Sequence, residues 1–139
     1  QERLNDGMQH LRTAVTLKPK DDSVRFNLGG GLLIAGQQEA ALREFRTAVA
    51  LNPENADAHF NLAMILGPRN QVDEAVAHLQ RVVEINPLDA EAFRNLAFAC
   101  GLQRRFDDAL RAAQTAVRLK PDSAAAREQL QRLLLAARR

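Results

Sequence analysis

The chain contains a single cysteine, Cys100, and has neither tryptophan nor tyrosine. One cysteine excludes an intramolecular disulfide and leaves the redox compartment undecided. No stretch approaches the roughly 18 apolar residues of a membrane-spanning helix. The net charge is also small, because 19 Lys and Arg nearly balance 17 Asp and Glu, and the sequence has no concentrated basic patch. We therefore expect no membrane span and no nucleic-acid partner.

Proline is sparse but regularly placed. Four of the five prolines recur every 34 residues: Pro19, Pro53, Pro87 and Pro121. Two places after each of them stands an Asp, Asn or Ser, the residue types favoured as helix N-caps: Asp21, Asn55, Asp89 and Ser123. Each of these prolines is therefore predicted to lie in a short turn between two helices. An equal period along the whole chain is typical of stacked helical repeats.

Apolar residues recur at helical spacing after each predicted N-cap. Leucines share one column, and four residues later a second apolar column follows: Leu28, Leu62, Leu96 and Leu130, then Leu32, Leu66, Cys100 and Leu134. No segment shows the sustained alternation of a β-strand, so the chain is predicted to be all-α. Pro68 is the exception to the period, and it predicts that the helix before it ends near Leu66.

These columns resemble the tetratricopeptide repeat over essentially all 139 residues. The shared pattern is a 34-residue helix–turn–helix unit with Leu followed by Gly or Ala, then Ala, then an Ala-Val or Val-Val pair, then Asn or Lys before Pro. The resemblance implies a right-handed α-solenoid of antiparallel helix pairs, in which the first helix of each pair lines a concave groove. The lack of Trp and Tyr predicts smaller side chains between neighbouring repeats than is usual in the family.

A single array over residues 1–139 is predicted. Residues 1–19 would be the second helix of a truncated repeat, 22–53, 56–87 and 90–121 three complete repeats, and 124–139 a capping helix. Because the chain starts partway through a repeat, we expect it to be a piece of a longer protein. The unpaired first helix would also allow end-to-end self-association.

The most informative column holds an asparagine in each repeat: Asn27, Asn61 and Asn95, continued by Gln129. In the tetratricopeptide-repeat family, an asparagine here points into the groove and can bind the backbone of a peptide. A carboxamide suits this role because it offers both donors and an acceptor. The alternative is that these side chains cap or bridge adjacent helices.

Apolar and charged residues are expected beside the asparagines. The resemblance places Phe26, Phe60 and Arg94 in the groove, with Met64 and Phe98 one turn further on. Phenyl and thioether groups suit apolar ligand side chains, although the phenylalanines could instead pack between helices.

Two acidic residues also fall in the predicted groove. Asp57 and Glu91 share one column and would tolerate a basic ligand residue, unless they are merely solvated. One subclass of the family clamps the terminal carboxylate of chaperones with Lys, Arg and Asn. Only Asn61 matches that pattern, and Glu91 has the wrong sign, so we expect no binding of this kind.

No catalytic constellation is present, and we expect no cofactor, no metal and no enzymatic activity. The run Gly29-Gly30-Gly31 lies within a helical pattern and lacks the strand and the Lys-Ser/Thr of a phosphate loop. Cys100 and His59 are interpreted as packing residues. The chain is therefore predicted to bind a protein or peptide partner in its groove. The alternatives are a structural spacer and a substrate-recruiting appendage of an enzyme such as a glycosyltransferase.

Overall fold

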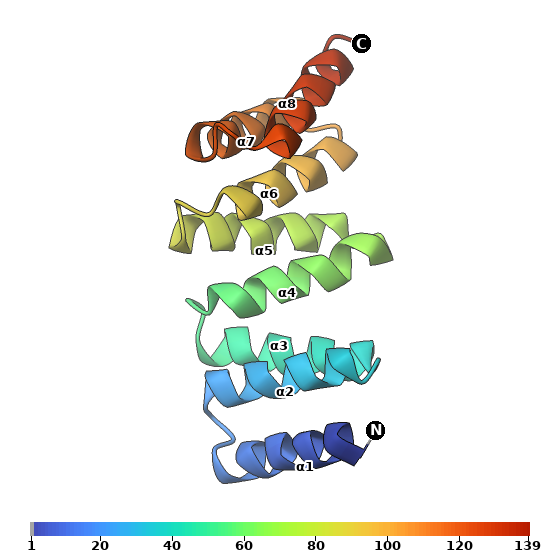
Figure 1. The fold of residues 1–139 in the computed structure, drawn as a ribbon, viewed down its shortest axis with the longest axis vertical. Coiled ribbons are helices and arrows are strands. Elements are labelled where there is room, and N and C mark those ends of the chain that lie inside the picture. Colours follow the sequence, from blue (N-terminus) through green and yellow to red (C-terminus); the bar gives the residue numbers. More distant parts are fainter. Residues whose placement is uncertain (1) are drawn as a thin grey trace. The chain divides into compact units, whose positions relative to one another are not determined.

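Helices account for nearly all of the chain. A computed structural model describes residues 2–139, and Figure 1 shows consecutive helices joined by short turns. Residues 2–139 contain no β-strand, so the predicted all-α fold is confirmed. In chain order the helices are α1 (Glu2–Leu17), α2 (Asp22–Ile34), α3 (Gln38–Leu51), α4 (Ala56–Leu66), the short 3-10 helix η1 (Gly67–Arg69), α5 (Val72–Ile85), α6 (Ala90–Leu102), α7 (Phe106–Leu119) and α8 (Ala124–Ala137).

A side-chain hydrogen bond closes the start of each helix that follows a recurring proline. The backbone N–H three residues after each cap donates to the side-chain oxygen of the cap, over 3.2 Å at Asp21, 2.9 Å at Asn55, 3.0 Å at Asp89 and 3.2 Å at Ser123. Each bond satisfies one of the N–H groups that have no partner within the helix. The four predicted N-caps are therefore confirmed.

The helix before Pro68 is short. α4 has 11 residues and ends at Leu66, whereas α2 and α6 have 13 each. η1 follows immediately, and Asn70 then adopts a left-handed conformation with φ 62°. The early end predicted from Pro68 is thus confirmed. The physical cause is that the residue before a proline is disfavoured in the α conformation, and proline itself has no N–H to donate.

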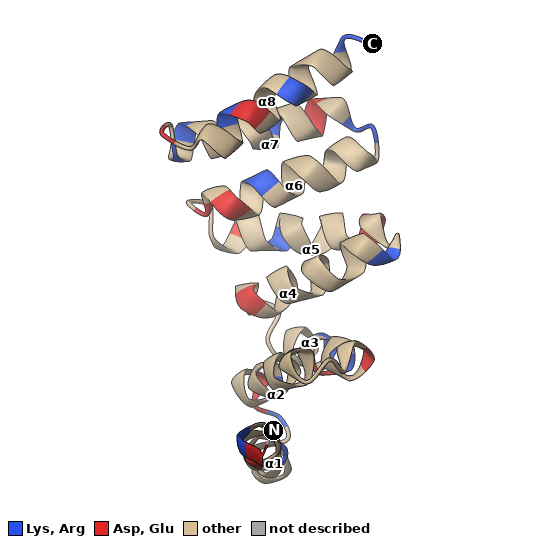
Figure 2. Cartoon of the chain, turned by 45° about the vertical axis from the view of Figure 1, so that its right-hand side comes forward, with Lys and Arg blue, Asp and Glu red and all other residues tan. Residues whose placement is uncertain are grey.

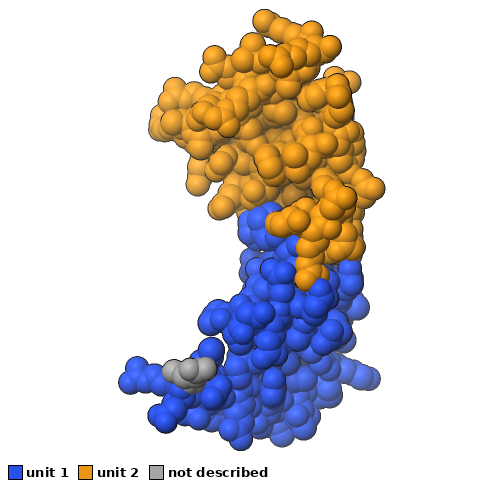
Figure 3. Space-filling view, turned by 90° about the vertical axis from the view of Figure 1, so that its right-hand side faces the viewer, with its two compact units in different colours: residues 1–65 blue, residues 66–139 orange. Residues whose placement is uncertain are grey.

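The chain divides into two compact units, residues 1–65 and 66–139, which Figure 3 shows in different colours. In the first unit, α2 contacts both α1 and α3. Phe45 of α3 is completely buried and lies beside Gly29 of α2, where an added Cβ would come within 2.6 Å of its ring. Phe26 of α2 packs on the same ring with a centroid distance of 5.6 Å. Glycine at position 29 therefore makes room for the phenyl group.

The core of the second unit is rich in alanine. α6 contacts α5 and α7, and α7 also contacts α8. Five alanines of α6 and α7 are completely buried: Ala92, Ala97, Ala109, Ala113 and Ala116. Small side chains allow helices to approach closely, because the distance between helix axes depends on the residues at the contact. The contact between α6 and α7 thus relies on small residues, whereas the contact between α2 and α3 includes a buried phenylalanine.

The first and last helices bury less than the others. Met8 is the one buried residue recorded for α1, while Leu4 and Leu17 are exposed. On α8, Leu134 is 41% exposed although its column contains the buried residues Leu32 and Leu66, because no helix among residues 2–139 follows α8 to cover that side. Self-association through α1 and the division into repeats stay predictions.

Charges of both signs are interspersed along the helices (Figure 2). Many form pairs over one helical turn, such as Arg105 with Asp108 at 2.7 Å. Hydrogen bonds from Arg105, which has the larger effect, and from Arg111 lower the pKa of the Asp108 carboxyl below its ordinary value. Arg25 of α2 pairs with Glu44 of α3 at 3.0 Å. None of the helices within residues 2–139 combines the length and apolar character that crossing a membrane requires.

Candidate peptide-binding surface

In the first unit, the predicted groove residues lie on α2 and α4. Asn27 and Asp57 are exposed, and Met64 is 39% exposed. Asn61 is half-buried, and its Nδ2 donates to the backbone oxygen of Asp57 at 2.9 Å, one turn back in the same helix. This bond leaves the Oδ1 atom of Asn61 available as an acceptor. Asn61 therefore does not bridge two helices, which was the structural alternative for this column.

The two phenylalanines of the first unit differ from the exposed amides. Phe26 is half-buried against the ring of the buried Phe45, so it contributes to packing between α2 and α3. Phe60 of α4 is also half-buried. Phe26 is thus a packing residue, and Met64 is the more accessible apolar side chain on this surface.

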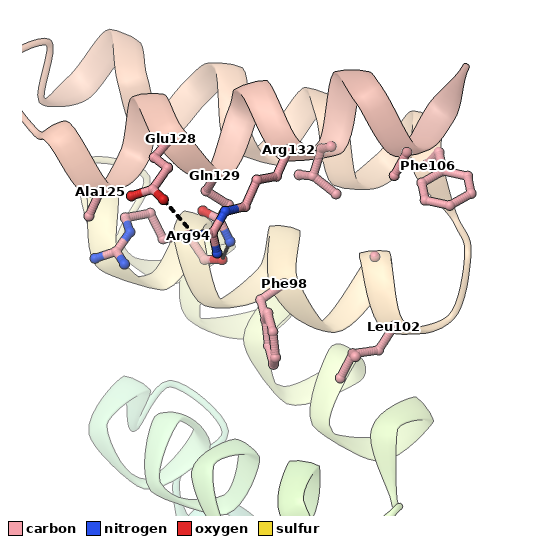
Figure 4. A pocket seen from close by; sticks show the side chains of 11 residues that line it. Arg94, Phe98, Leu102, Phe106, Ala125, Glu128, Gln129 and Arg132 are labelled. Carbon is pink, nitrogen blue, oxygen red and sulfur yellow. Dashed lines mark hydrogen bonds and ion pairs between the residues drawn. The ribbon is translucent and has the colours of Figure 1, made fainter. Parts of the chain in front are cut away.

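In the second unit, a cavity of about 460 Å³ lies between α6 and α8 (Figure 4). Two large apolar side chains of α6 form part of its wall and are unusually accessible, Phe98 at 62% and Leu102 at 57% exposed. α8 contributes Leu133 and Ala136 on the opposite side. We refer to this cavity as the α6–α8 pocket. It is an apolar recess that a ligand side chain can enter.

The polar wall of the α6–α8 pocket contains two buried atoms without a partner. Nε of Arg94 on α6 and Oε1 of Gln129 on α8 are both shielded from solvent and make no hydrogen bond. Gln129 does bind α6 through its Nε2, which donates to the backbone oxygen of Arg94 at 2.8 Å. Nearby on α8, Arg132 pairs with Glu128 at 2.5 Å. The two unpartnered atoms therefore lie inside the wall between α6 and α8 and not on its open surface.

Two other predicted site residues of the second unit are close in sequence to residues that line this pocket. Asn95 on α6 is half-buried, and Glu91 is exposed. Glu91 and Arg94 line a neighbouring cavity of about 210 Å³ together with Lys120. The predicted site residues thus fall into two groups, one in each compact unit: Phe26, Asn27, Asp57, Phe60, Asn61 and Met64 in the first, and Glu91, Arg94, Asn95 and Phe98 in the second.

Of the α8 wall of the pocket, only Gln129 was predicted from the sequence, as the continuation of the asparagine column. Glu128, Arg132 and Ala136 follow Arg94, Phe98 and Leu102 by exactly one 34-residue period, so their place beside α6 was available from the repeat. They were missed because α8 was interpreted as a capping helix whose polar residues only face water.

The residues interpreted as packing residues are buried. His59 is 7% exposed, and its Nε2 hydrogen-bonds the carbonyl oxygen of Pro53 at 3.0 Å. Cys100 is 1% exposed, and burial raises the pKa of its thiol. Across residues 2–139, no group of three or more His, Cys, Asp or Glu could hold a metal ion.

The state of Cys100 yields a direct prediction. We expect its thiol to react with iodoacetamide at pH 8 at least roughly 10-fold more slowly in the native protein than in 8 M urea, because the raised pKa reduces the thiolate fraction and burial blocks access. The chain has one cysteine, so mass spectrometry of the intact protein reports this reaction alone. Equal rates in the two conditions would mean that Cys100 is accessible in the native state.

The antiparallel helix pairs, the recurring caps and the exposed amides together define a helical-repeat protein. Residues 32–97 match the family model described as tetratricopeptide repeat. This match and the shared fold support an assignment to the tetratricopeptide repeats, as the 34-residue period indicated. A search of the curated proteins found no match to this sequence.

Solved structures share the fold over most of the chain. MamA (residues 41 to the end) from Desulfovibrio magneticus RS-1 has a TM-score of 0.84 at 22% identity, with 96% of this chain and 75% of that chain covered. YrrB, described as a TPR protein with an unusual peptide-binding site, has a TM-score of 0.77 at 25% identity, covering 94% and 67%. The first TPR of Spaghetti (RPAP3), bound to the HSP90 peptide SRMEEVD, has a TM-score of 0.77 at 16% identity, covering 86% and 94%.

Proposed function

We propose that this chain is a non-catalytic interaction module that binds an extended peptide segment of a partner protein. The contact surface would comprise the exposed faces of the first helices of the repeats, with Asn27, Asn61 and Asn95 binding the peptide backbone. The observation that carries the proposal is that each asparagine retains polar atoms without a partner, and that Asn61 and Asn95 are each followed one turn later by an exposed apolar side chain, Met64 and Phe98.

The geometry supports an extended ligand. Asn27 and Asn61 of the first unit are one 34-residue period apart in sequence, and an extended peptide, which rises about 3.3 Å per residue, can present its backbone groups to both. Such a ligand exposes N–H and C=O groups that a carboxamide can bind on both sides. YrrB and the Spaghetti domain are described with a peptide-binding site and with a bound peptide, respectively, which agrees with this class of function.

The proposal is tested by removing two of the three amides. We expect the double variant Asn61→Ala with Asn95→Ala to bind peptides selected from a random 12-residue library about 10-fold to 30-fold more weakly, since each hydrogen bond contributes about 1 kcal/mol. Fluorescence anisotropy measures the affinities, and circular dichroism checks the helical content of the variant.

A matched control removes two exposed carboxamides that lie elsewhere on the repeats. Gln80 on α5 and Gln114 on α7 are one period apart and exposed, on the second helices rather than the first. The double variant Gln80→Ala with Gln114→Ala should bind the selected peptides like the unmodified chain. Unchanged affinity in both double variants would contradict the proposed role of the asparagines.

A further inference from the structure

We propose that the α6–α8 pocket is a subsite for an acidic residue and a large aliphatic residue that are separated by one residue in an extended peptide. The inference rests on the proposed peptide-binding function and assigns the chemistry of the ligand. Two features of the second unit carry it: an apolar recess and a cation without an anionic partner.

The apolar recess accounts for the aliphatic residue. Phe98 and Leu102 of α6 expose more than half of their surface to water, and Leu133 of α8 lines the same cavity. Covering such surface is favourable in proportion to the apolar area removed from water. The volume of about 460 Å³ lies in the range of about 300–1,000 Å³ typical of pockets that enclose ligand groups.

The cation accounts for the acidic residue. Arg94 forms no ion pair with any residue that the structure describes, and its Nε is a buried donor without an acceptor. Glu128, the acidic residue in the wall of the pocket, is already paired with Arg132. Glu91 shares the neighbouring cavity with Arg94 but makes no ion pair with it. A guanidinium can bind a carboxylate through two parallel N–H···O bonds from its terminal Nη1 and Nη2 atoms, which are not recorded as buried in Arg94.

The spacing of the two features sets the spacing of the motif. Figure 4 shows Arg94 toward one end of the pocket, beside Ala125, and Phe98 and Leu102 toward the other end. Arg94 and Phe98 are four residues apart on α6, which is about 6 Å along a helix axis. In an extended peptide, residues i and i+2 lie on the same side and are about 6.6 Å apart. One intervening residue therefore matches the pocket.

Gln129 holds α8 against α6 between the cation and the apolar recess. Its Nε2 is held by the backbone oxygen of Arg94, so the side chain has a defined orientation. Its Oε1 is buried and accepts no hydrogen bond in the free protein.

The test uses fluorescein-labelled peptides with Asp-Ala-Leu, Lys-Ala-Leu or Asp-Ala-Ser between identical Gly-Ser flanks. We expect Asp-Ala-Leu to bind about 10-fold more tightly than either of the others, and its amide-shift perturbations in labelled protein to centre on α6 and α8. Arg94→Gln should remove the preference for Asp over Lys while keeping the preference for Leu over Ser. Phe98→Ala should remove the preference for Leu over Ser while keeping the preference for Asp over Lys.

Two controls separate specific recognition from general effects of charge and folding. Arg118→Gln removes an exposed arginine of α7 and should leave both preferences intact. Arg94→Glu should favour Lys-Ala-Leu over Asp-Ala-Leu, which a general loss of structure cannot produce. Equal affinity for the Asp and Lys peptides, or shifts that avoid α6 and α8, would overturn the subsite.

The same measurements distinguish failure of the subsite from failure of the proposed function. If the Asp-Ala-Leu preference is absent while library peptides still lose affinity in the double asparagine variant, the subsite is wrong and the interaction module stands. If neither the library nor Asp-Ala-Leu yields a binding peptide, both are wrong.

Discussion

Replacing Phe45 by alanine is expected to lower the free energy of unfolding of residues 1–65 by about 3–5 kcal/mol. Phe45 is completely buried, lies directly beside Gly29 and packs on the ring of Phe26. Removing the phenyl group leaves a cavity that glycine cannot fill, because it has no side chain to move into the space. Native-state hydrogen exchange of the α2 and α3 amides measures this free energy within the first unit.

The matched control is Phe98→Ala in the second unit. Phe98 is 62% exposed, so its removal should change stability by no more than about 0.5 kcal/mol. This outcome also ensures that the Phe98 variant used in the peptide test is folded. A loss at Phe45 no larger than that at Phe98 would mean that the first unit does not depend on this ring.

Alanine at two adjacent glycines of α2 is expected to change stability in opposite directions. At Gly29 a Cβ would lie 2.6 Å from Cε1 of the buried Phe45, whereas at Gly30 no atom lies within 4 Å of it. Gly30→Ala should therefore stabilise the first unit by about 0.5–1 kcal/mol through helix propensity. Gly29→Ala should destabilise it by about 1–2 kcal/mol, because overpacking of about 1–3 kcal/mol exceeds the same gain in propensity.

A compensating substitution distinguishes the clash from other causes. One period later the chain has Ala63 and Leu79 in the places of Gly29 and Phe45, so alanine and leucine occur together in that repeat. Phe45→Leu should accordingly be less harmful in the presence of Gly29→Ala than in its absence, a coupling that a double-mutant cycle measures. Urea unfolding followed at 222 nm gives the four stabilities. Stabilisation by both glycine substitutions would contradict the clash.

Local features of the fold were largely predictable. The N-caps at Asp21 and Ser123 and the end of α4 at Leu66 follow from short-range rules, since a cap bonds three residues away and a proline acts on its neighbour. The exposure of Leu134 was not predictable from its column, because burial depends on whether another helix covers that side.

The candidate surface was predictable only in part. The period places Asn27, Asn61 and Asn95 at one repeat position, yet their surroundings differ: Asn61 bonds its own helix, and Gln129 in the same column bridges α8 to α6. Phe26 and Phe98 lie one helical turn apart in the repeat pattern, and Phe26 is packed while Phe98 is exposed. A repeat position specifies which helix a side chain is on, but its contacts depend on the size of the residues opposite.

The 34-residue period, read from the prolines and the leucine columns, was sufficient to establish an all-α tetratricopeptide-repeat fold, because caps, turns and helical spacing are encoded within a few residues of one another. The α6–α8 pocket could be identified only from the folded structure. Its unpartnered atoms, Nε of Arg94 and Oε1 of Gln129, belong to residues 35 apart in sequence, and their lack of a partner is a property of what surrounds them in space. Repetition determines the scaffold, whereas packing between helices determines where a ligand can bind.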